Sequence, residues 1–174
     1  MNGRLQIGDL KETTGSHYYG LSTAGYNLAA NGCASVQLAQ AANLSTAAYS
    51  MFALVKDTKN LYRWYQAGND LVIEKKVGDV KTTLATLQYA AATHQYLRIR
   101  RATNPATGTQ DVVFETATDN AGVPGTWTER FRHTWDSAIS TTALKVELKA
   151  GTSSAEVAPG SVHWDNVRVA SNCK

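Results

Sequence analysis

Alternation of apolar and polar residues with a period of two recurs along almost the whole chain, and it constrains the fold most. Such a pattern places successive side chains on opposite faces of a β-strand. Clusters of turn-forming residues, for example 57–60 and 119–125, separate the alternating segments. The alanines of residues 38–48 favour a helix, but their apolar spacing is poor. The predicted strands are 4–7, 34–40, 49–55, 61–66, 71–76, 96–101, 111–118, 126–132, 142–149 and 162–169.

The number of short strands predicts two packed antiparallel sheets. The chain has 174 residues and a mass of 18.8 kDa, and no repeat or linker interrupts it, so we expect one domain over residues 1–174. Hydrophobic residues make up 43% of the chain and charged residues 18%, a balance typical of strand-rich globular proteins. The expected fold class is all-β, a two-sheet antiparallel jelly-roll sandwich.

The alternation also predicts which side chains face the core. In 60–66, Arg63 is expected to point outward, which places Leu61 and Tyr65 outward with it and Tyr62 and Trp64 inward. In 96–101, Leu97 and Ile99 are expected in the core. In 142–149, we expect Leu144, Val146 and Leu148 in the core and Lys145, Glu147 and Lys149 on the surface.

Several outward residues together predict a polar and aromatic groove. The simpler alternative is that Arg98 or Arg100 forms an ion pair with Glu115 on a neighbouring strand, a contact that contributes about 0.2 to 1 kcal/mol. The candidate ligand-binding residues are Arg63, Tyr65, Tyr96, Arg98, Arg100, Glu115 and Trp135.

The order of several short motifs resembles the concanavalin A-like lectin and glucanase superfamily. These motifs are 57–64 (DTKNLYRW), 70–73 (DLVI), 76–79 (KVGD), 96–100 (YLRIR), 113–119 (VFETATD) followed by Trp127, and 164–169 (WDNVRV). Over residues 4–169 the pattern is most similar to laminin-G-like jelly-roll modules of bacterial and phage surface proteins and glycosidases. The resemblance implies a concanavalin A-like jelly roll that binds glycans.

The glucanases of that superfamily carry paired carboxylates on one strand, and this chain lacks that pattern. The nearest candidates, Asp111 and Glu115, are four residues apart on a predicted strand. Without a bulge they share one face at about 13 Å by strand rise, which is too far for a retaining pair. No nucleophile elbow surrounds any histidine, and no glycine-rich phosphate loop precedes a helix. We therefore expect no enzyme.

The four tryptophans fall into two predicted groups. Trp64 and Trp164 are expected in the core. Trp127 and Trp135 lie beside polar loops, where each is either a platform for a sugar ring or a lid on one end of the sandwich. The lid is the favoured role for Trp127, and the two roles are evenly balanced for Trp135. Among the histidines, we expect only His163 to be partly buried.

A calcium site near the chain termini is a further expectation. In many jelly-roll binding modules, a position like that of Asp165 supplies a carboxylate to a structural calcium, and Asp9 would be a second ligand if the first and last strands are neighbours. Calcium prefers six to eight oxygen ligands, so one aspartate is weak support. The alternative is that Asp165 caps a turn or bulge through backbone N–H groups.

The two cysteines, Cys33 and Cys173, are either free thiols or one disulfide. Neither has His or Cys neighbours at zinc-ligand spacing. Cys33 opens one predicted strand and Cys173 follows the last one. If these strands are antiparallel neighbours, the sequence predicts a disulfide, which favours an oxidising compartment.

The remaining features limit the partners. The net charge is +3, with cations scattered among acids, so no nucleic-acid partner is expected, and no apolar run has the length of a membrane span. Residues 1–4 (MNGR) lack the pattern of a signal peptide, so we expect a removed leader or a piece of a longer protein with other domains. The predicted function is a carbohydrate-binding or adhesion module of a secreted, cell-surface or phage protein. The alternatives are a ligand-free structural or oligomerisation domain of a phage tail or surface fibre, and an unrecognised glycoside hydrolase or polysaccharide lyase.

Overall fold

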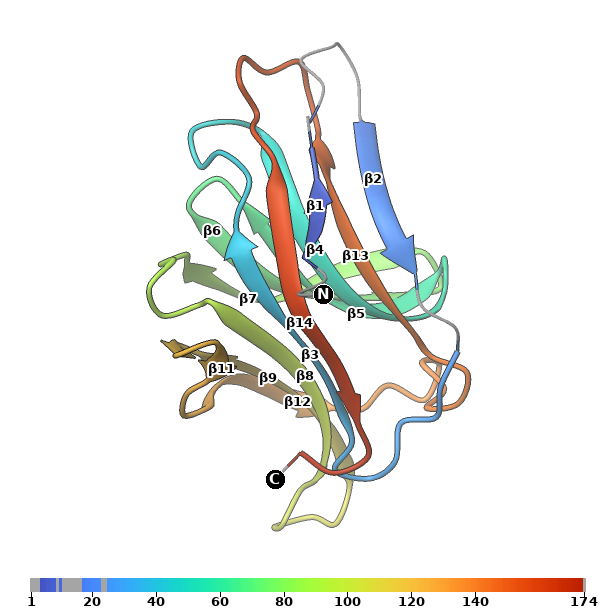
Figure 1. Ribbon diagram of the computed structural model, residues 1–174. Coiled ribbons are helices and arrows are strands. Elements are labelled where there is room, and N and C mark those ends of the chain that lie inside the picture. Colours follow the sequence, from blue (N-terminus) through green and yellow to red (C-terminus); the bar gives the residue numbers. More distant parts are fainter. Residues whose placement is uncertain (1–3, 9, 11–16, 23–24, 174) are drawn as a thin grey trace.

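Two six-stranded antiparallel sheets form the protein in a computed structural model that describes residues 4–8, 10, 17–22 and 25–173 (Figure 1). The first, here the β8 sheet, has the order β1 (Leu5–Ile7), β14 (Val162–Ala170), β3 (Cys33–Gln40), β8 (Tyr96–Thr103), β9 (Gln110–Ala117) and β12 (Thr128–Thr134). The second, here the β5 sheet, has the order β2 (His17–Ser22), β13 (Lys145–Thr152), β4 (Ala48–Asp57), β5 (Asn60–Ala67), β6 (Asp70–Val77) and β7 (Val80–Gln88). A small hairpin pairs β10 (Asp119–Asn120) with β11 (Val123–Pro124).

One hydrophobic core fills the space between the sheets, so the predicted jelly-roll sandwich is confirmed. Trp64 of the β5 sheet packs edge-on against Phe114 of the β8 sheet, with ring centroids 5.4 Å apart. Its indole Nε1–H donates to the carbonyl of Arg98 at 3.2 Å, which ties the two sheets together. Trp64 and Trp164 are buried, as predicted. The described residues contain no helix, and residues 38–48 form the end of β3, a turn and the start of β4.

The face assignments from the sequence are confirmed on both sheets. Tyr62 lies in the main core beside Trp64, and Arg63 and Tyr65 lie on the opposite face of β5. Leu97 and Ile99 belong to the core. On β13, Val146 and Leu148 are buried, Lys145 is exposed, and Glu147 and Lys149 are half-buried and paired at 2.6 Å. Leu61 faces outward but belongs to a second apolar cluster, with Met51, Ala53 and Val55, on the outer face of the β5 sheet.

The sequence analysis missed two strands of the six-stranded sheets, and it identified the β10–β11 hairpin only as a turn. Strand β7 is an edge strand whose residues are mostly exposed, and a register shift opposite Ile73 and Glu74 breaks its alternation. Its hairpin with β6 turns through Gly78 and Asp79, both with positive φ (58° and 70°), as a two-residue loop requires. Strand β2 pairs with β13 at the other edge of the β5 sheet.

Candidate functional site

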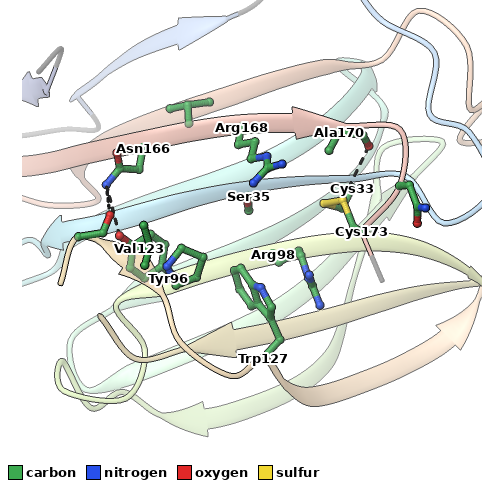
Figure 2. Close-up of a pocket in the computed structure, with 14 residues that line it drawn as sticks. Cys33, Ser35, Tyr96, Arg98, Val123, Trp127, Asn166, Arg168, Ala170 and Cys173 are labelled. Atoms are coloured by element: carbon green, nitrogen blue, oxygen red, sulfur yellow. Dashed lines mark hydrogen bonds between the residues drawn. A yellow bond between two sulfur atoms is a disulfide. The ribbon is translucent and has the colours of Figure 1, made fainter. Parts of the chain in front are cut away.

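A pocket of about 480 Å³ opens on the outer face of the β8 sheet (Figure 2). Its floor comes from β3 and β8, its first wall from the β10–β11 hairpin and Trp127, and its second wall from β14 and the segment that follows. A volume of this size lies within the usual range for small-molecule sites, about 300 to 1,000 Å³. The lining residues are Cys33, Ser35, Tyr96, Arg98, Gly122, Val123, Pro124, Trp127, Asn166, Val167, Arg168, Ala170, Asn172 and Cys173.

The floor follows from strand alternation. In β3, Ala34 and Val36 belong to the core, so Cys33 and Ser35 face the other side. The register of the sheet then places Ser35 opposite Arg98 of β8. Because the serine side chain is short, the sheet surface is hollowed at this point.

The first wall is a tight hairpin. Ala121 and Gly122 connect β10 to β11 with φ values of 53° and 86°, and the Gly122 N–H donates to the Asp119 carboxylate at 3.2 Å. At the base of the hairpin, a Cβ on Gly125 would lie 2.9 Å from Thr118 Oγ1, so only glycine fits there without a shift. The hairpin thereby holds Val123 and Pro124 against the pocket.

The second wall depends on a bulge in β14. The register with β3 shifts between Asp165 and Arg168, and Asn166 within the bulge has a φ of 50°. The Asn166 side-chain amide donates to Gln37 Oε1 at 2.7 Å and to the Tyr96 hydroxyl at 3.3 Å. The bulge fixes Asn166 and presents Val167 and Arg168 to the pocket.

Trp127 is held in place by a chain of charged contacts. The Arg98 guanidinium lies 4.2 Å from the centroid of the Trp127 ring, a cation–π contact, and its Nε–H donates to Glu115 Oε2 at 2.6 Å. Arg100 also binds the Glu115 carboxylate, with contacts of 3.0 and 3.1 Å. Both arginines therefore form the cross-strand ion pairs that were the simpler alternative to a ligand-binding role.

The ionisation of Glu115 reflects two opposed effects. Burial raises its pKa, but the hydrogen bonds and charges of Arg100 and Arg98 together outweigh burial and hold the pKa below its ordinary value. Glu115 is thus a carboxylate in the folded protein. Its role is to fix the two arginines.

The two carboxylates considered for catalysis are both occupied by arginines. Asp111 and Glu115 lie on the same face of β9, since Val112 and Phe114 between them are core residues. Asp111 binds Arg132 at 3.2 Å and accepts a hydrogen bond from Asn104 at 3.1 Å. Ion-paired carboxylates that stand apart on a strand do not match the paired geometry of glycosidases.

The structure divides the predicted groove between two opposite faces of the sandwich. Tyr96, Arg98, Arg100 and Glu115 lie together on the outer face of the β8 sheet. Arg63 and Tyr65 belong to β5 in the other sheet, so the expectation of one groove with all these residues is wrong. Alternation shows which face of its own strand a residue occupies, but it does not assign the strand to a sheet.

Arg63 and Tyr65 border a shallower hollow of about 390 Å³ on the β5 sheet. The Tyr65 ring stacks on Tyr49, with centroids 5.1 Å apart. Arg63 donates from Nε to Glu74 Oε2 at 2.6 Å and also lies 5.0 Å from the centroid of the Tyr65 ring. Burial, followed by the proximity of Tyr49, raises the pKa of Tyr65.

The structure distinguishes the two loop tryptophans: Trp135 has the lid role, one of the two considered for it, whereas the lid role favoured for Trp127 is wrong. Trp135 packs on the main core beside Tyr62, with centroids 5.1 Å apart, and its indole N–H donates to the Ile139 carbonyl at 2.7 Å. It closes one end of the sandwich. Trp127, which we expected to be the lid, lines the pocket.

Ser35, Asn166 and Arg168 were missed by the sequence analysis. Ser35 lies on a predicted strand, and its outward position follows from Ala34 and Val36, so alternation was a usable signal. No comparable signal exists for Asn166 and Arg168, because the bulge changes the facing of β14 after Asp165.

The calcium expectation concerns Asp165 and Asp9. Asp165 Oδ1 accepts a hydrogen bond from the Asn166 backbone N–H at 2.8 Å, and Oδ2 lies 3.5 Å from Arg4 Nε, in line with the bulge-capping alternative. Asp9 lies outside the described residues. Within the described part of the chain, no group of three or more His, Cys, Asp or Glu residues is placed to hold a metal ion.

Cys33 and Cys173 form a disulfide at the edge of the pocket, with Cα atoms 5.9 Å apart. The premise of the sequence argument holds, since β3 and β14 are antiparallel neighbours and Cys33 pairs with Ala170. The bridge, drawn between Cys33 and Cys173 in Figure 2, fixes the segment after β14, and Asn172 of this segment lines the pocket.

Of the three histidines whose burial the structure describes, His94 is buried, with 5% of its surface exposed, whereas His133 and His163 are half-buried. The expectation that only His163 would be partly buried is therefore wrong. His94 lies in the connection from β7 to β8, and its Nδ1 accepts from the Ala90 N–H at 3.0 Å. Burial, followed by the positive charge of Arg130, lowers the pKa of His94.

No protein-family model matches this chain, and no curated protein sequence matches it. Among solved structures, a toad ovary galectin in complex with thio-digalactose is similar at 11% identity and a TM-score of 0.49, over 87% of this chain and 98% of the galectin. CG-16, a homodimeric agglutinin from chicken liver, is 11% identical with a TM-score of 0.47, over 87% of this chain and 100% of the agglutinin.

A third similar structure is the CBM2 module of the evolved Dit of Lactobacillus casei BL23 phage J-1. It is 9% identical with a TM-score of 0.48, over 85% of this chain and 69% of that chain. At these scores the likenesses carry no argument about function. The fold assignment rests on the strand order and the shared core of this chain.

Proposed function

We propose that the protein is a non-catalytic glycan-binding module and that its saccharide site is the pocket on the β8 sheet. The proposal extends to an adhesive role in a secreted, cell-surface or virion protein. The disulfide fits such an oxidising location. In the parts of the chain that the structure describes, no helix is both long and apolar enough to cross a membrane.

The single observation that carries the proposal is the rigid aromatic wall of the pocket. Saccharide rings present apolar C–H faces that stack on flat aromatic side chains, while their hydroxyls need fixed polar partners. Trp127 supplies the aromatic ring, and the contacts from Glu115 through Arg98 hold it in one position. A preorganised side chain loses little entropy when a ligand binds, so more of the contact energy appears as affinity.

The other lining groups fit a ring with hydroxyls. Val123 and Val167 are exposed at the rim, by 55% and 43%, and offer apolar contact beside Trp127. Ser35 and Asn172 offer side-chain hydrogen-bonding groups from the floor and the far edge. This mixture of an aromatic wall, an apolar rim and a few fixed polar groups is typical of small-ligand sites.

The test fills the pocket without disturbing the core. Replacing Ser35 with Leu places a larger apolar side chain on the floor between the two walls, on the face of β3 opposite to the core residues Ala34 and Val36. The matched control, Ser35→Ala, keeps the pocket open. A glycan array on the wild-type protein first identifies a ligand, and calorimetric titration then compares the variants.

We expect Ser35→Leu to lose binding and Ser35→Ala to bind within a few-fold of wild type, with melting curves that show both variants folded. A wild-type protein that binds no glycan on a broad array contradicts the proposed function. Equal binding by Ser35→Leu and Ser35→Ala places the site elsewhere on the molecule.

A further inference from the structure

We infer that the pocket selects acidic saccharides, in which a carboxylate or sulfate group pairs with Arg168 and Arg98 while the sugar ring contacts Trp127. This inference rests on the proposed function and names its ligand class. It follows from the register of the strands, from the local charge balance and from the groups that remain open to a ligand.

The sheet register aligns two arginines across the pocket floor. Arg168 of β14 pairs in register with Ser35 of β3, and Ser35 pairs with Arg98 of β8. Neighbouring strands lie about 4.8 Å apart, so the two arginine backbones are separated by about 10 Å with one short side chain between them. Figure 2 shows Arg168 and Arg98 on the two sides of Ser35. The two long cationic side chains thus border one small hollow.

The charge balance at this floor is positive. Arg98 and Arg100 share the single carboxylate of Glu115, so these three groups leave one positive charge. Arg168 adds a second, since its side chain is exposed and forms no ion pair or hydrogen bond within the described part of the chain. None of the 14 described residues that line the pocket is Asp or Glu.

The acidic side chains nearest to the pocket are already engaged. Asp119 accepts hydrogen bonds from the Tyr96 hydroxyl at 3.2 Å and from the Gly122 N–H. Asp165 contacts Arg4. Glu129 of β12, which lies in register with Glu115 of β9, forms an ion pair with Arg132 at 2.7 Å. These contacts leave the positive charge at the pocket without a described counter-ion.

The donors of both arginines fit an anionic group. The bond to Glu115 uses Arg98 Nε, and no described residue accepts from either Nη atom of Arg98 or from Arg168. Arg168 is exposed, and the Arg98 side chain keeps 8% of its surface accessible, so both can present these nitrogens to the pocket that they line. Guanidinium groups bind carboxylates and other oxyanions through paired, charge-assisted hydrogen bonds.

The experiment compares ligands that differ only in charge. Oligogalacturonate, its neutral counterpart oligogalactose, and a sulfated galactose oligomer are titrated into the native, disulfide-bonded protein by calorimetry at 50 and 200 mM salt. The variants are Arg168→Gln in the pocket and Lys81→Gln as a control. Lys81 is an exposed cation on β7 of the other sheet, so its removal changes the net charge equally.

We expect an acidic oligomer to bind at least about tenfold more tightly than the neutral one, because charge-assisted hydrogen bonds from a guanidinium group are stronger than neutral ones. Arg168→Gln is expected to remove most of that preference, and Lys81→Gln to keep it. The relative affinity of the carboxylate and sulfate oligomers identifies which anion the site accommodates.

Two results overturn the inference while the proposed function stands. One is equal binding of neutral and acidic oligomers. The other is an acidic preference that Arg168→Gln and Lys81→Gln reduce to the same extent, which identifies it as a general effect of net charge. If no oligomer binds here and no glycan binds on the array, the proposed function fails with the inference.

Discussion

The two outer faces of the sandwich use similar residues to different ends. Each face carries an arginine over an aromatic ring and a glutamate that binds that arginine. On the β5 sheet, Arg63 and Glu74 lie beside the stacked pair of Tyr49 and Tyr65, and these tyrosines pack on a buried apolar cluster. On the β8 sheet, the corresponding contacts surround a pocket.

The difference lies in the backbone elements that border each face. The β10–β11 hairpin and the bulge of β14 rise on either side of Ser35 and leave space between them. The hollow on the β5 sheet is lined by residues of four strands and one adjoining turn, and it is shallower. Similar side-chain chemistry therefore yields a candidate site only where a hairpin and a bulge form walls.

The largest expected effect concerns the covalent bond on the β8 face. The disulfide closes a loop with a sequence separation of 140 residues. On the chain-entropy model, its removal in a Cys33→Ser/Cys173→Ser variant lowers the free energy of unfolding by about 4 to 5 kcal/mol, as an upper figure. Chemical denaturation of both proteins measures this loss.

The same bridge also fixes one edge of the pocket, so the double variant is expected to bind saccharide less tightly under conditions where it remains folded. Intact mass after alkylation, with and without reductant, checks the bond itself. Two reactive thiols in the native, unreduced protein contradict the disulfide.

The next comparison sets one glutamate from each face against the other. Glu115→Gln is expected to cost about 3 to 5 kcal/mol of stability, since it leaves Arg98 and Arg100 without their buried partner. Glu74→Gln leaves only Arg63 without its carboxylate partner, and the Arg63 side chain is more exposed than that of Arg98 (18% against 8%). This variant is therefore expected to lose about 1 kcal/mol of stability or less. Urea denaturation at neutral pH compares the two variants, and equal losses contradict the difference between the faces.

Acid adds a second test of Glu115. Its pKa is lower in the folded protein than in the unfolded chain, so its contribution to stability is complete above about pH 4.5 and is lost as the pH falls through the folded value. The slope of stability against pH below about 4.5 is therefore expected to be smaller in Glu115→Gln. Denaturation midpoints from pH 6 to pH 3 measure this slope.

The sequence predicted the all-β sandwich, the core residues and the residues that face outward from each strand. It did not predict the walls that make a pocket on the β8 sheet. The alternation around Arg63 and around Arg98 gave the correct faces, because burial of a strand side chain repeats every second residue. Alternation does not show which strands pair, because pairing joins segments that are far apart in the sequence. The predicted groove therefore combined residues from the outer faces of two different sheets. The walls depend on the bulge at Asn166 and on the β10–β11 hairpin, which had been identified only as a turn.

A smaller effect is expected in the connection between the two sheets. Because burial lowers the pKa of His94 in the folded protein, its neutral form stabilises the fold above about pH 6.5, and this stability is lost as the pH falls. His94→Asn keeps an acceptor for the Ala90 N–H and removes the titration. Its melting temperature is expected to fall less than that of wild type between pH 7 and pH 5.5. Equal decreases in the two proteins contradict this role of His94.

The smallest expected effect is that of calcium, proposed on the β8 face at Asp165. An ion that binds only the folded state raises the melting temperature, so a small increase is expected in millimolar calcium and a decrease after chelation. Asp165→Asn is expected to abolish the increase. An unchanged melting temperature in wild type argues against the metal.

The most direct test of the central claim is a saccharide titration followed by two-dimensional NMR of the backbone amides and the four tryptophan indoles. We predict shifts at residues 33–37, 96–100 and 166–170 and at the Trp127 indole. The amides of residues 63–67 and the indoles of Trp135 and Trp164 are expected to remain unchanged. Shifts at residues 49–53 and 63–67, with none around Ser35 and Trp127, would contradict the account and place the binding site on the β5 sheet.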